Sequence, residues 1–379
     1  MLTHTDGVID LAWGHPSENL HPLSALQPAI DSIFANDDVA ALQYSGYQGY
    51  GPLIESLSQY LSDEPSYTNK IEGRELYLGY GASHGLDLAC TLFTKTGDTV
   101  LVEEPSYYLV RQILIDHGLT IVGVPTDNEG MVTEDLEQII QSHKNSVKLL
   151  YLIPSYHNPM GSVMSHARRE KIIELADKYN FLIAADEAYH LLYYYDPPPP
   201  TMASLANSDQ GSVVSLGSFS KILAPGIKLG WVQSKPSLVD KFTNSGANFS
   251  GGNNNFAAAI VDIAIRKGIL SKHINLLRRT YRSRMEVMAT ALETHIPDAK
   301  FCKPHGGYYF WITFPEQIDA LVLEKYALEE GVTLRPGVAF SGENLFSNCI
   351  RLCFALSDIE QIPEGIYRLS KAYSRHVLG

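Results

Sequence analysis

Short and almost wholly apolar runs alternate with amphipathic segments through most of this chain. The strand-like runs cover residues 75–79, 99–103, 119–124, 147–153, 181–185, 212–217 and 229–232. Runs that are apolar throughout are typical of strands covered on both faces. Between two of these runs, Leu86, Ala89, Cys90 and Phe93 have the spacing of one helix face. The alternation predicts an α/β domain in which helices flank a mostly parallel central sheet.

The pattern changes near residue 271. A long helical stretch ends at Pro297 and is followed by strand-like runs at 308–314 and 349–354, with a helical stretch at 321–329 between them. This order is typical of a smaller α+β domain. We therefore expect an N-terminal arm that joins the small domain (1–44), a large domain (45–280) and a small C-terminal domain (281–379).

Charge and cysteine content exclude several classes of partner. The 29 basic and 42 acidic side chains of the 379 residues give a net charge of 29 − 42 = −13, which disfavours binding to nucleic acid and to anionic membranes. No apolar run is long enough to span a membrane, and the first residues do not resemble a secretion signal. The four cysteines form no C-x-x-C pair, so we expect reduced thiols, no metal site and a cytoplasmic protein.

A glycine-rich loop at 79–85, Gly-Tyr-Gly-Ala-Ser-His-Gly, follows one predicted strand and opens a helix. With Glu103 at the end of the next strand, it is similar to the dinucleotide fingerprint of dehydrogenases. The spacing is G-x-G-x-x-x-G rather than the tighter form, and the loop comes late in the chain. Backbone N–H groups at a helix N-terminus bind any phosphate, so the loop predicts an anion site without naming the ligand.

Four polar segments each follow a buried strand directly. They are residues 104–108 (EPSYY), 154–161 (PSYHNPMG), 186–189 (DEAY) and 218–221 (SFSK). Each alone has an ordinary explanation, such as a turn, a helix cap or a surface lysine. Ligands of parallel α/β sheets bind beyond the carboxyl ends of the strands. We therefore expect the four segments to meet at one edge of the sheet and to form a site.

These segments carry a resemblance to a known family. Residues 218–231, SFSKILAPGIKLGW, are similar to the S-x-S-K-x-x-x-x-P-G-x-R-x-G signature of the fold-type I, class I/II aminotransferases, which depend on pyridoxal 5′-phosphate (PLP). The NPMG and DEAY segments match in type and order, from Gly14 to Arg351. The opening segments LAWGHP and ALQYSGYQGYGPL are similar to the 2-aminoadipate/kynurenine aminotransferase branch. The resemblance implies an aspartate aminotransferase-like fold, in which the large domain binds PLP.

The resemblance assigns the reacting residues. Lys221 would hold PLP as a Schiff base (an aldimine) and later act as the general base. Asp186 would keep the pyridine nitrogen protonated, so that the ring can accept electrons. Asn158 and Tyr189 would hydrogen-bond the phenolate oxygen of the ring, and Tyr107 would stack on its face.

Further residues would bind the phosphate and the substrate. The phosphate would bind Gly81, Ala82, Ser83, Ser218 and Lys228. The family usually has arginine at the position of Lys228, and lysine keeps the charge but loses the bidentate fork.

Arg351 would bind the substrate α-carboxylate beside Asn158, with Gly14 allowing close approach of the backbone. An internal salt bridge is the alternative for this arginine. No second arginine can be assigned from the sequence to a side-chain carboxylate. Tyr44 would reach the phosphate of the neighbouring subunit, which implies a homodimer with a shared active site.

The implied reaction is ping-pong transamination, from an L-amino acid to a 2-oxo acid. Elimination, cyclisation, racemisation or oxidation on the same scaffold is the alternative, because a fold does not fix the reaction. A PLP-binding regulator and a dehydrogenase are further alternatives. DNA binding would support the regulator, and nicotinamide binding would support the dehydrogenase.

Overall fold

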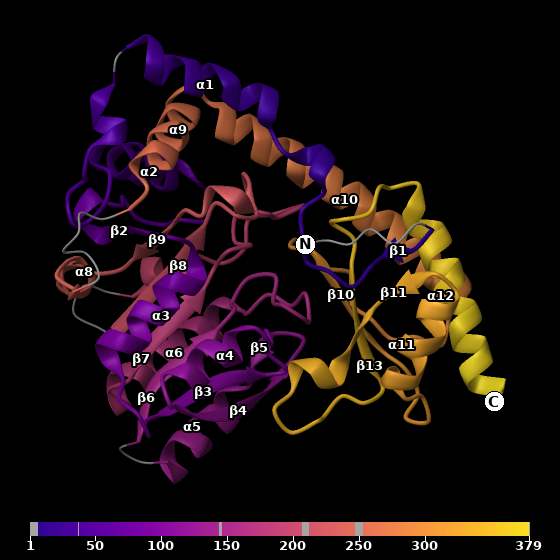
Figure 1. Cartoon of the computed structure of the whole chain (residues 1–379). Coiled ribbons are helices and arrows are strands. Elements are labelled where there is room, and N and C mark those ends of the chain that lie inside the picture. Colours follow the sequence, from indigo (N-terminus) through magenta and orange to yellow (C-terminus); the bar gives the residue numbers. More distant parts are fainter. Residues whose placement is uncertain (1–6, 37, 144–145, 207–211, 247–252, 379) are drawn as a thin grey trace.

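The central sheet of the large domain organises the molecule (Figure 1). In the computed structural model, which describes residues 7–36, 38–143, 146–206, 212–246 and 253–378, this sheet has eight strands. Their order across the sheet is β2 (Leu76–Gly79), β9 (Gly230–Gln233), β8 (Ser212–Ser218), β7 (Leu182–Asp186), β6 (Val147–Leu152), β3 (Thr99–Glu104), β4 (Thr120–Asp127) and β5 (Gly130–Met131). Neighbours from β8 to β4 are parallel, whereas β2, β9 and β5 pair antiparallel. The predicted α/β architecture is confirmed.

Helices cover both faces of this sheet, which explains why its strands are apolar throughout. Leu149 and Tyr151 pack on the face covered by α3 (Ala82–Phe93), α4 (Val110–Asp116) and α8 (Pro236–Thr243). Leu150 and Leu152 pack on the opposite face, against α5 (Thr133–Ser142), α6 (His166–Tyr179) and α7 (Met202–Leu205). Alternate side chains of one strand therefore enter two separate cores.

A second layer of helices lies beside the β2 and β9 edge of the sheet. It contains α1 (Leu23–Ala35), η2 (Val39–Leu42), α2 (Gly51–Asp63) and α9 (Asn255–Arg266). The helix α9 contacts α1, α2 and η2. The helix α10 (Ile269–His295) continues from α9 toward the C-terminal part of the chain, where it packs against α12 (Gln361–Leu378) (Figure 1). Its end at His295 lies two residues before Pro297, as the sequence predicts.

The C-terminal part has its own antiparallel sheet. Its strands are β10 (Tyr309–Thr313), β13 (Cys349–Cys353) and β12 (Arg335–Pro336), in that order. The helix α11 (Ala320–Glu329) and α12 pack together beside it. Near the N-terminus, β1 (Ile9–Asp10) pairs in parallel with β11 (Val332–Thr333), so the first described residues lie against the C-terminal part. The domain limits 1–44, 45–280 and 281–379 stay predictions.

No helix within the described ranges combines the length and the apolar character that crossing a membrane requires.

Candidate active site

A cavity of about 300 Å³ lies at the carboxyl ends of β3, β6, β7 and β8. The chain order of the sheet reverses between β3 and β6, which is where α/β sheets bind their ligands. The predicted site residues that line the cavity are Gly14, Gly81, Ala82, Ser83, Tyr107, Asn158, Asp186, Tyr189, Ser218, Lys221, Lys228 and Arg351. The four polar segments therefore meet at one edge, as expected, and the N-terminal arm and the C-terminal sheet complete the wall.

One end of the cavity is built to hold an anion. Gly81 precedes α3 with φ +111°, a backbone conformation that L side chains rarely adopt, and the helix begins at Ala82. The first N–H groups of α3 have no partner within the helix, and the dipole of the helix favours a negative charge beside them. Ser218 and Lys228 line the same cavity, and Lys228 also has a left-handed φ of 51°.

The amine of Lys221 lies in the same cavity. Its Nζ donates a hydrogen bond to the carbonyl oxygen of Gly14, at 2.9 Å. The rings of Tyr189 and Tyr308 have their centroids 5.9 and 5.7 Å from this nitrogen. Burial lowers the pKa of Lys221 to about 8, because a charged ammonium is poorly solvated there. A useful fraction of the amine is therefore neutral near physiological pH.

Asp186 ends β7 and is held by two hydrogen bonds. The hydroxyl of Tyr151 donates to its Oδ2 at 2.9 Å, and the backbone N–H of Ala188 donates to its Oδ1 at 3.2 Å. Burial raises the pKa of Asp186, while these bonds and the charge of Lys221 oppose the rise. A carboxylate in this setting is well suited to hold a cationic group in the cavity.

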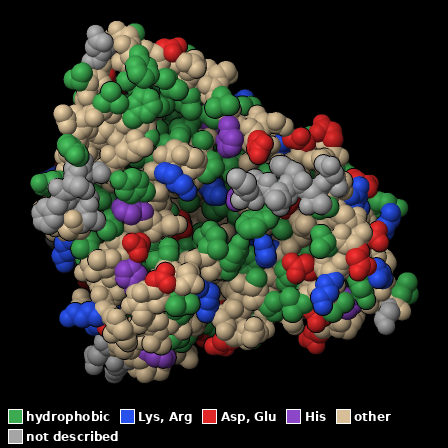
Figure 2. Space-filling model, in the orientation of Figure 1, with side chains coloured by type: hydrophobic (Ala, Val, Ile, Leu, Met, Phe, Trp, Pro, Cys, Tyr) green, Lys and Arg blue, Asp and Glu red, His purple; other side chains and the backbone are tan. Residues whose placement is uncertain are grey.

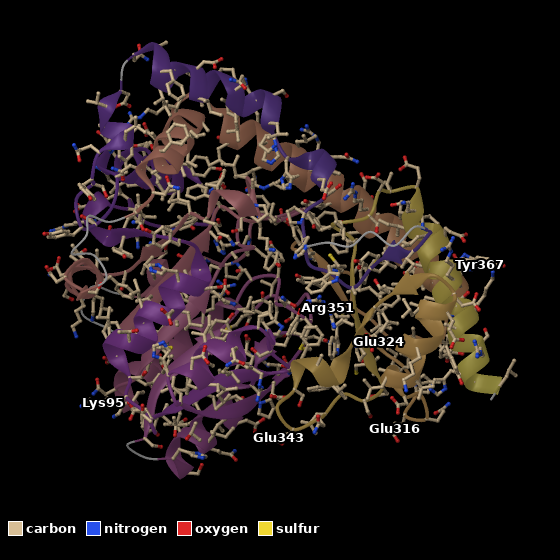
Figure 3. All side chains as sticks on the ribbon, in the orientation of Figure 1. Lys95, Glu316, Glu324, Glu343, Arg351 and Tyr367 are labelled. Carbon is tan, nitrogen blue, oxygen red and sulfur yellow. The ribbon has the colours of Figure 1, made fainter. Side chains whose placement is uncertain are left out.

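Arg351, in β13, is buried without a carboxylate partner among the described residues (Figure 3). Its Nη1 donates to Asn158 Oδ1 at 2.8 Å, and its Nη2 donates to the carbonyl oxygen of Ala12 at 2.6 Å. The guanidinium carbon lies 4.2 Å from the ring centroid of Tyr309, and the Nε has no hydrogen-bond partner in the structure. Among the described residues Arg351 therefore forms no internal salt bridge, which leaves this cation available to an anionic ligand.

Gly14, Tyr189 and Tyr309 fit closely together. The hydroxyls of Tyr189 and Tyr309 share a hydrogen bond of 2.9 Å. A Cβ on Gly14 would lie 1.9 Å from the Tyr309 hydroxyl oxygen, so a larger residue at position 14 would displace this tyrosine. Tyr107 also lines the cavity, and its ring meets that of Tyr108 edge-on.

Tyr44 is the predicted site residue that the structure does not bring to the cavity of its own chain. Its side chain is 79% exposed, and it borders a separate surface hollow with Gln43, Gly46 and Tyr50. A role at the neighbouring subunit's site stays a prediction.

Two residues that the sequence did not single out, Tyr151 and Tyr309, also shape the site, together with Trp13, which the sequence offers as an aromatic candidate for the substrate pocket. Tyr151 lies inside β6, one strand away from Asp186. In the sequence it stands in an apolar run, which predicts an ordinary core residue. Tyr309 lies in β10, far along the chain from the other site residues. Trp13 precedes Gly14 and lines the cavity. Tyr151 and Tyr309 reach the site because of the order in which the strands pair, and no local sequence motif indicates that order.

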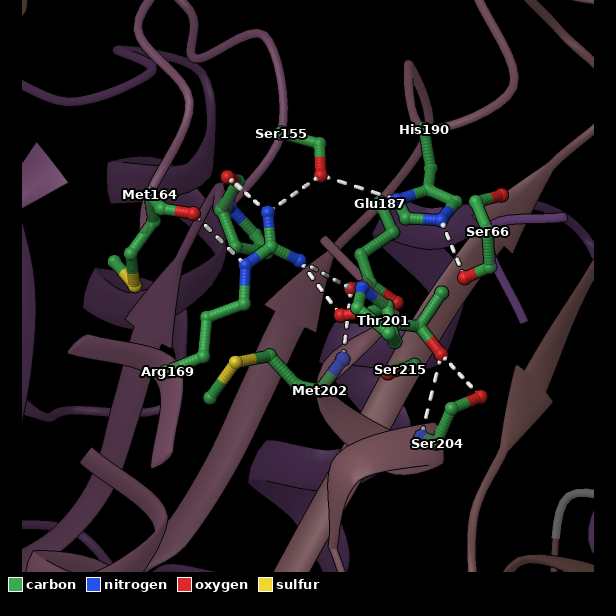
Figure 4. Close-up of polar contacts among 12 residues, drawn as sticks. Ser66, Ser155, Met164, Arg169, Glu187, His190, Thr201, Met202, Ser204 and Ser215 are labelled. Atoms are coloured by element: carbon green, nitrogen blue, oxygen red, sulfur yellow. Dashed lines mark hydrogen bonds and ion pairs between the residues drawn. The ribbon is translucent and has the colours of Figure 1, made fainter. Parts of the chain in front are cut away.

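A buried polar network lies behind the site and ties together the segments that carry Asn158 and Asp186 (Figure 4). Arg169, in α6, is fully buried. It donates to the carbonyl oxygens of Pro154 at 2.7 Å and Pro200 at 2.9 Å and to Ser155 Oγ at 2.9 Å. Ser155 Oγ is 3.0 Å from His190 Nδ1.

Glu187, the neighbour of Asp186, completes this network. Its carboxylate lies 4.0 Å from Arg169 Nη1 and accepts a hydrogen bond from the backbone N–H of Met202 at 3.0 Å. Burial raises the pKa of Glu187 to about 7, although the charge of Arg169 opposes the rise. The loops after β6 and β7 are thus fixed to α6 from the side opposite the cavity.

Comparison with known proteins gives a consistent result over almost the whole chain. The family model described as aminotransferase class I and II matches residues 6–369. An aromatic-amino-acid aminotransferase of Thermococcus litoralis is 33% identical over 374 residues, which cover 98% of this chain and 89% of the relative. A 2-aminoadipate transaminase of Thermus thermophilus is 29% identical, with 98% and 91% covered.

A solved structure is equally similar. The kynurenine aminotransferase of Pyrococcus horikoshii, in complex with PMP, kynurenine and its product, superimposes with a TM-score of 0.91 at 32% identity. The match covers 99% of this chain and 92% of that one.

Proposed function

The chain belongs to the class I and II aminotransferase family, and from this premise we propose that it carries an amino group from an L-amino acid to a 2-oxo acid through Lys221. It is a transaminase with the fold of the fold-type I PLP enzymes, and its family depends on PLP. Family membership overturns the dehydrogenase alternative, and nothing in the comparisons favours elimination, cyclisation or oxidation.

The residues of the cavity fit PLP. The N-terminus of α3, with Gly81, Ala82 and Ser83, offers N–H groups to a phosphate, and Ser218 and Lys228 line the same cavity. Asp186 supplies a buried anion for a cationic ring nitrogen, and Asn158 and Tyr189 offer polar groups to a ring oxygen. When bound, PLP supplies an electron-poor ring that accepts the electron pair left on the substrate Cα after it loses a proton.

The residues of the chain divide the remaining tasks. The neutral amine of Lys221 would take the proton from the substrate Cα and deliver it to the carbon C4′ of the cofactor. Arg351 holds the substrate α-carboxylate, and Gly14 leaves room beside it for the substrate to approach. Tyr107 covers one ring face, and the network around Arg169 keeps the loops of Asn158 and Asp186 in place.

One observation supports this proposal above the others. The same cavity contains the amine of Lys221, whose pKa is lowered to about 8, the buried carboxylate of Asp186, the guanidinium of Arg351 and the N-terminus of α3. The test has two parts. Borohydride reduction of the PLP-loaded protein should attach the cofactor to Lys221, as peptide mapping would show. An L-amino acid alone should then convert the absorbance of the loaded protein to that of the pyridoxamine form. Labelling of another lysine, or ammonia or peroxide released without an acceptor, contradicts the proposal.

We also propose a homodimer with shared active sites. Hydrophobic side chains gather over α1 and the segment that follows it, at the top of Figure 2. Leu23, Phe34, Val39, Leu42 and Tyr44 are between 63% and 79% exposed. An apolar surface of this kind marks an interaction site. The expected occupant is a second copy, which would bring Tyr44 to the phosphate end of the partner's cavity.

Mixing two variants tests the shared site. The Lys221→Ala and Tyr44→Phe proteins should each have low activity. Unfolding and refolding them together should restore activity, because each hybrid dimer contains one site with both native residues. Activity that stays at the mean of the two variants contradicts a shared site, and a monomer by light scattering contradicts the dimer.

A cytoplasmic location belongs to the same proposal, since Cys90, Cys302, Cys349 and Cys353 are free thiols.

A further inference from the structure

A second arginine lies beside Arg351 on the C-terminal sheet. Arg335, in β12, lies directly opposite Arg351, in β13, in the antiparallel pairing of these two strands. Directly opposed residues of an antiparallel pair project from the same face, with Cβ atoms about 5 Å apart. Both cationic side chains therefore leave the sheet on the side where Arg351 meets the cavity. Nothing in the sequence indicates this neighbourhood, because sixteen positions, 351 − 335, separate the two residues.

The guanidinium of Arg335 lies between two aromatic residues that line the cavity. Its carbon is 5.3 Å from the ring centroid of Trp13 and 5.7 Å from that of Tyr108. Contacts with two ring faces fix the planar group while leaving its N–H groups free to bind. The side chain is thus held against two residues of the cavity wall rather than extended into solvent.

The charge of Arg335 is not neutralised locally. Within the described residues no carboxylate lies within 4.0 Å of it, and its buried Nε has no hydrogen-bond partner. Glu324, in α11 (Figure 3), is near enough for Arg335 to oppose the rise that burial causes in its pKa, but the two form no ion pair. Two adjacent cations repel each other unless an anion lies between or beside them.

We propose that Arg335 binds a second carboxylate, so that the site accepts short dicarboxylic amino acids and 2-oxo acids. The inference rests on the proposed function, in which Arg351 binds the α-carboxylate. The far carboxylate of the same substrate would pair with Arg335, and its methylene groups would contact Trp13 and Tyr108. A monocarboxylic substrate would use Arg351 alone and leave Arg335 unpaired.

Steady-state kinetics with two acceptors test this assignment. Arg335→Gln should lower kcat/KM for 2-oxoglutarate about tenfold or more, because a charge-assisted bond is lost. The same variant should change kcat/KM for pyruvate less than twofold, and Arg335→Lys should restore part of the lost activity. The control is Arg74→Gln, which removes the same charge from an exposed side chain. Equal losses with both acceptors would mean that Arg335 only supports Trp13 and Tyr108, and would overturn the proposal.

A binding measurement on the protein as purified separates this proposal from the proposed function. Glutarate, a dicarboxylate without an amino group, should raise the melting temperature of the wild-type and Arg74→Gln proteins more than butyrate does, and should lose this advantage in Arg335→Gln. Equal effects of glutarate on all three proteins overturn the assignment of Arg335. Failure of borohydride to label Lys221 overturns the proposed function instead, and the glutarate result still decides the role of Arg335.

Discussion

In the proposed function the chemistry depends on the neutral amine of Lys221, and the pH dependence of this amine follows from its pKa. Burial lowers the pKa of Lys221 to about 8 from the ordinary 10.5. At pH 7 the amine is then neutral in about 9% of molecules, against about 0.03% for an ordinary lysine. Since the neutral amine is the nucleophile, its reactive fraction is about 300-fold larger.

Trace acetylation of the cofactor-free protein measures this pKa. With a small amount of acetic anhydride between pH 6 and 10, mass spectrometry gives the labelling rate of the peptide that contains Lys221, relative to that of the exposed Lys95 (Figure 3). We expect the corrected rate to rise about tenfold per pH unit and to level off near pH 8. Restricted access lowers the rate equally at every pH, so it does not move the midpoint.

Two variants test the causes of the shift. Arg351→Met removes a cation and should raise the midpoint, and Asp186→Asn removes an anion and should lower it. Cys353 contributes little near neutral pH, because burial raises the pKa of its thiol and keeps it uncharged. A midpoint above about pH 9.5, or no movement in either variant, would refute the reasoning.

Three further predictions concern the support of the site. Gly14→Ala should lower kcat/KM at least tenfold, because its Cβ would lie 1.9 Å from the Tyr309 hydroxyl oxygen, and adding Tyr309→Phe should recover part of the loss in the same assay. Tyr151→Phe removes a bond to the Asp186 carboxylate worth about 1.5–3 kcal/mol, so kcat should fall about tenfold or more while the far-ultraviolet circular dichroism stays native. Burial raises the pKa of Glu187 from 4.5 to about 7, so the folded chain binds a proton that the unfolded chain releases, and stability falls by about 3 kcal/mol as pH rises through this window. Urea unfolding at pH 5, 6 and 7 measures this effect. The free energy of unfolding should fall less steeply with pH in Glu187→Gln than in the wild-type protein, and an equal fall in both proteins would contradict this cause.

Local sequence features predict the large sheet and most of the cavity because each polar segment directly follows a buried strand. Asp186 and Lys221 come together once β7 and β8 pair in parallel, and the apolar runs already require that arrangement. Arg335 and Tyr309 could not be placed in this way. Their positions depend on β10, β13 and β12 pairing across long loops, and the register of such strands follows from packing rather than from a motif. Tyr44 could not be placed because its predicted target belongs to another copy of the chain.

The long helix α10 has a mechanical consequence. Its 27 residues span about 40 Å and lie between the part of the chain that carries Lys221 and the part that carries Arg351. A continuous helix of this length resists bending, so we expect it to limit hinge motion between the two halves. Movements of the C-terminal half should therefore be small and directional. In the proposed site, they would bring Arg351 closer to the substrate α-carboxylate or move it away.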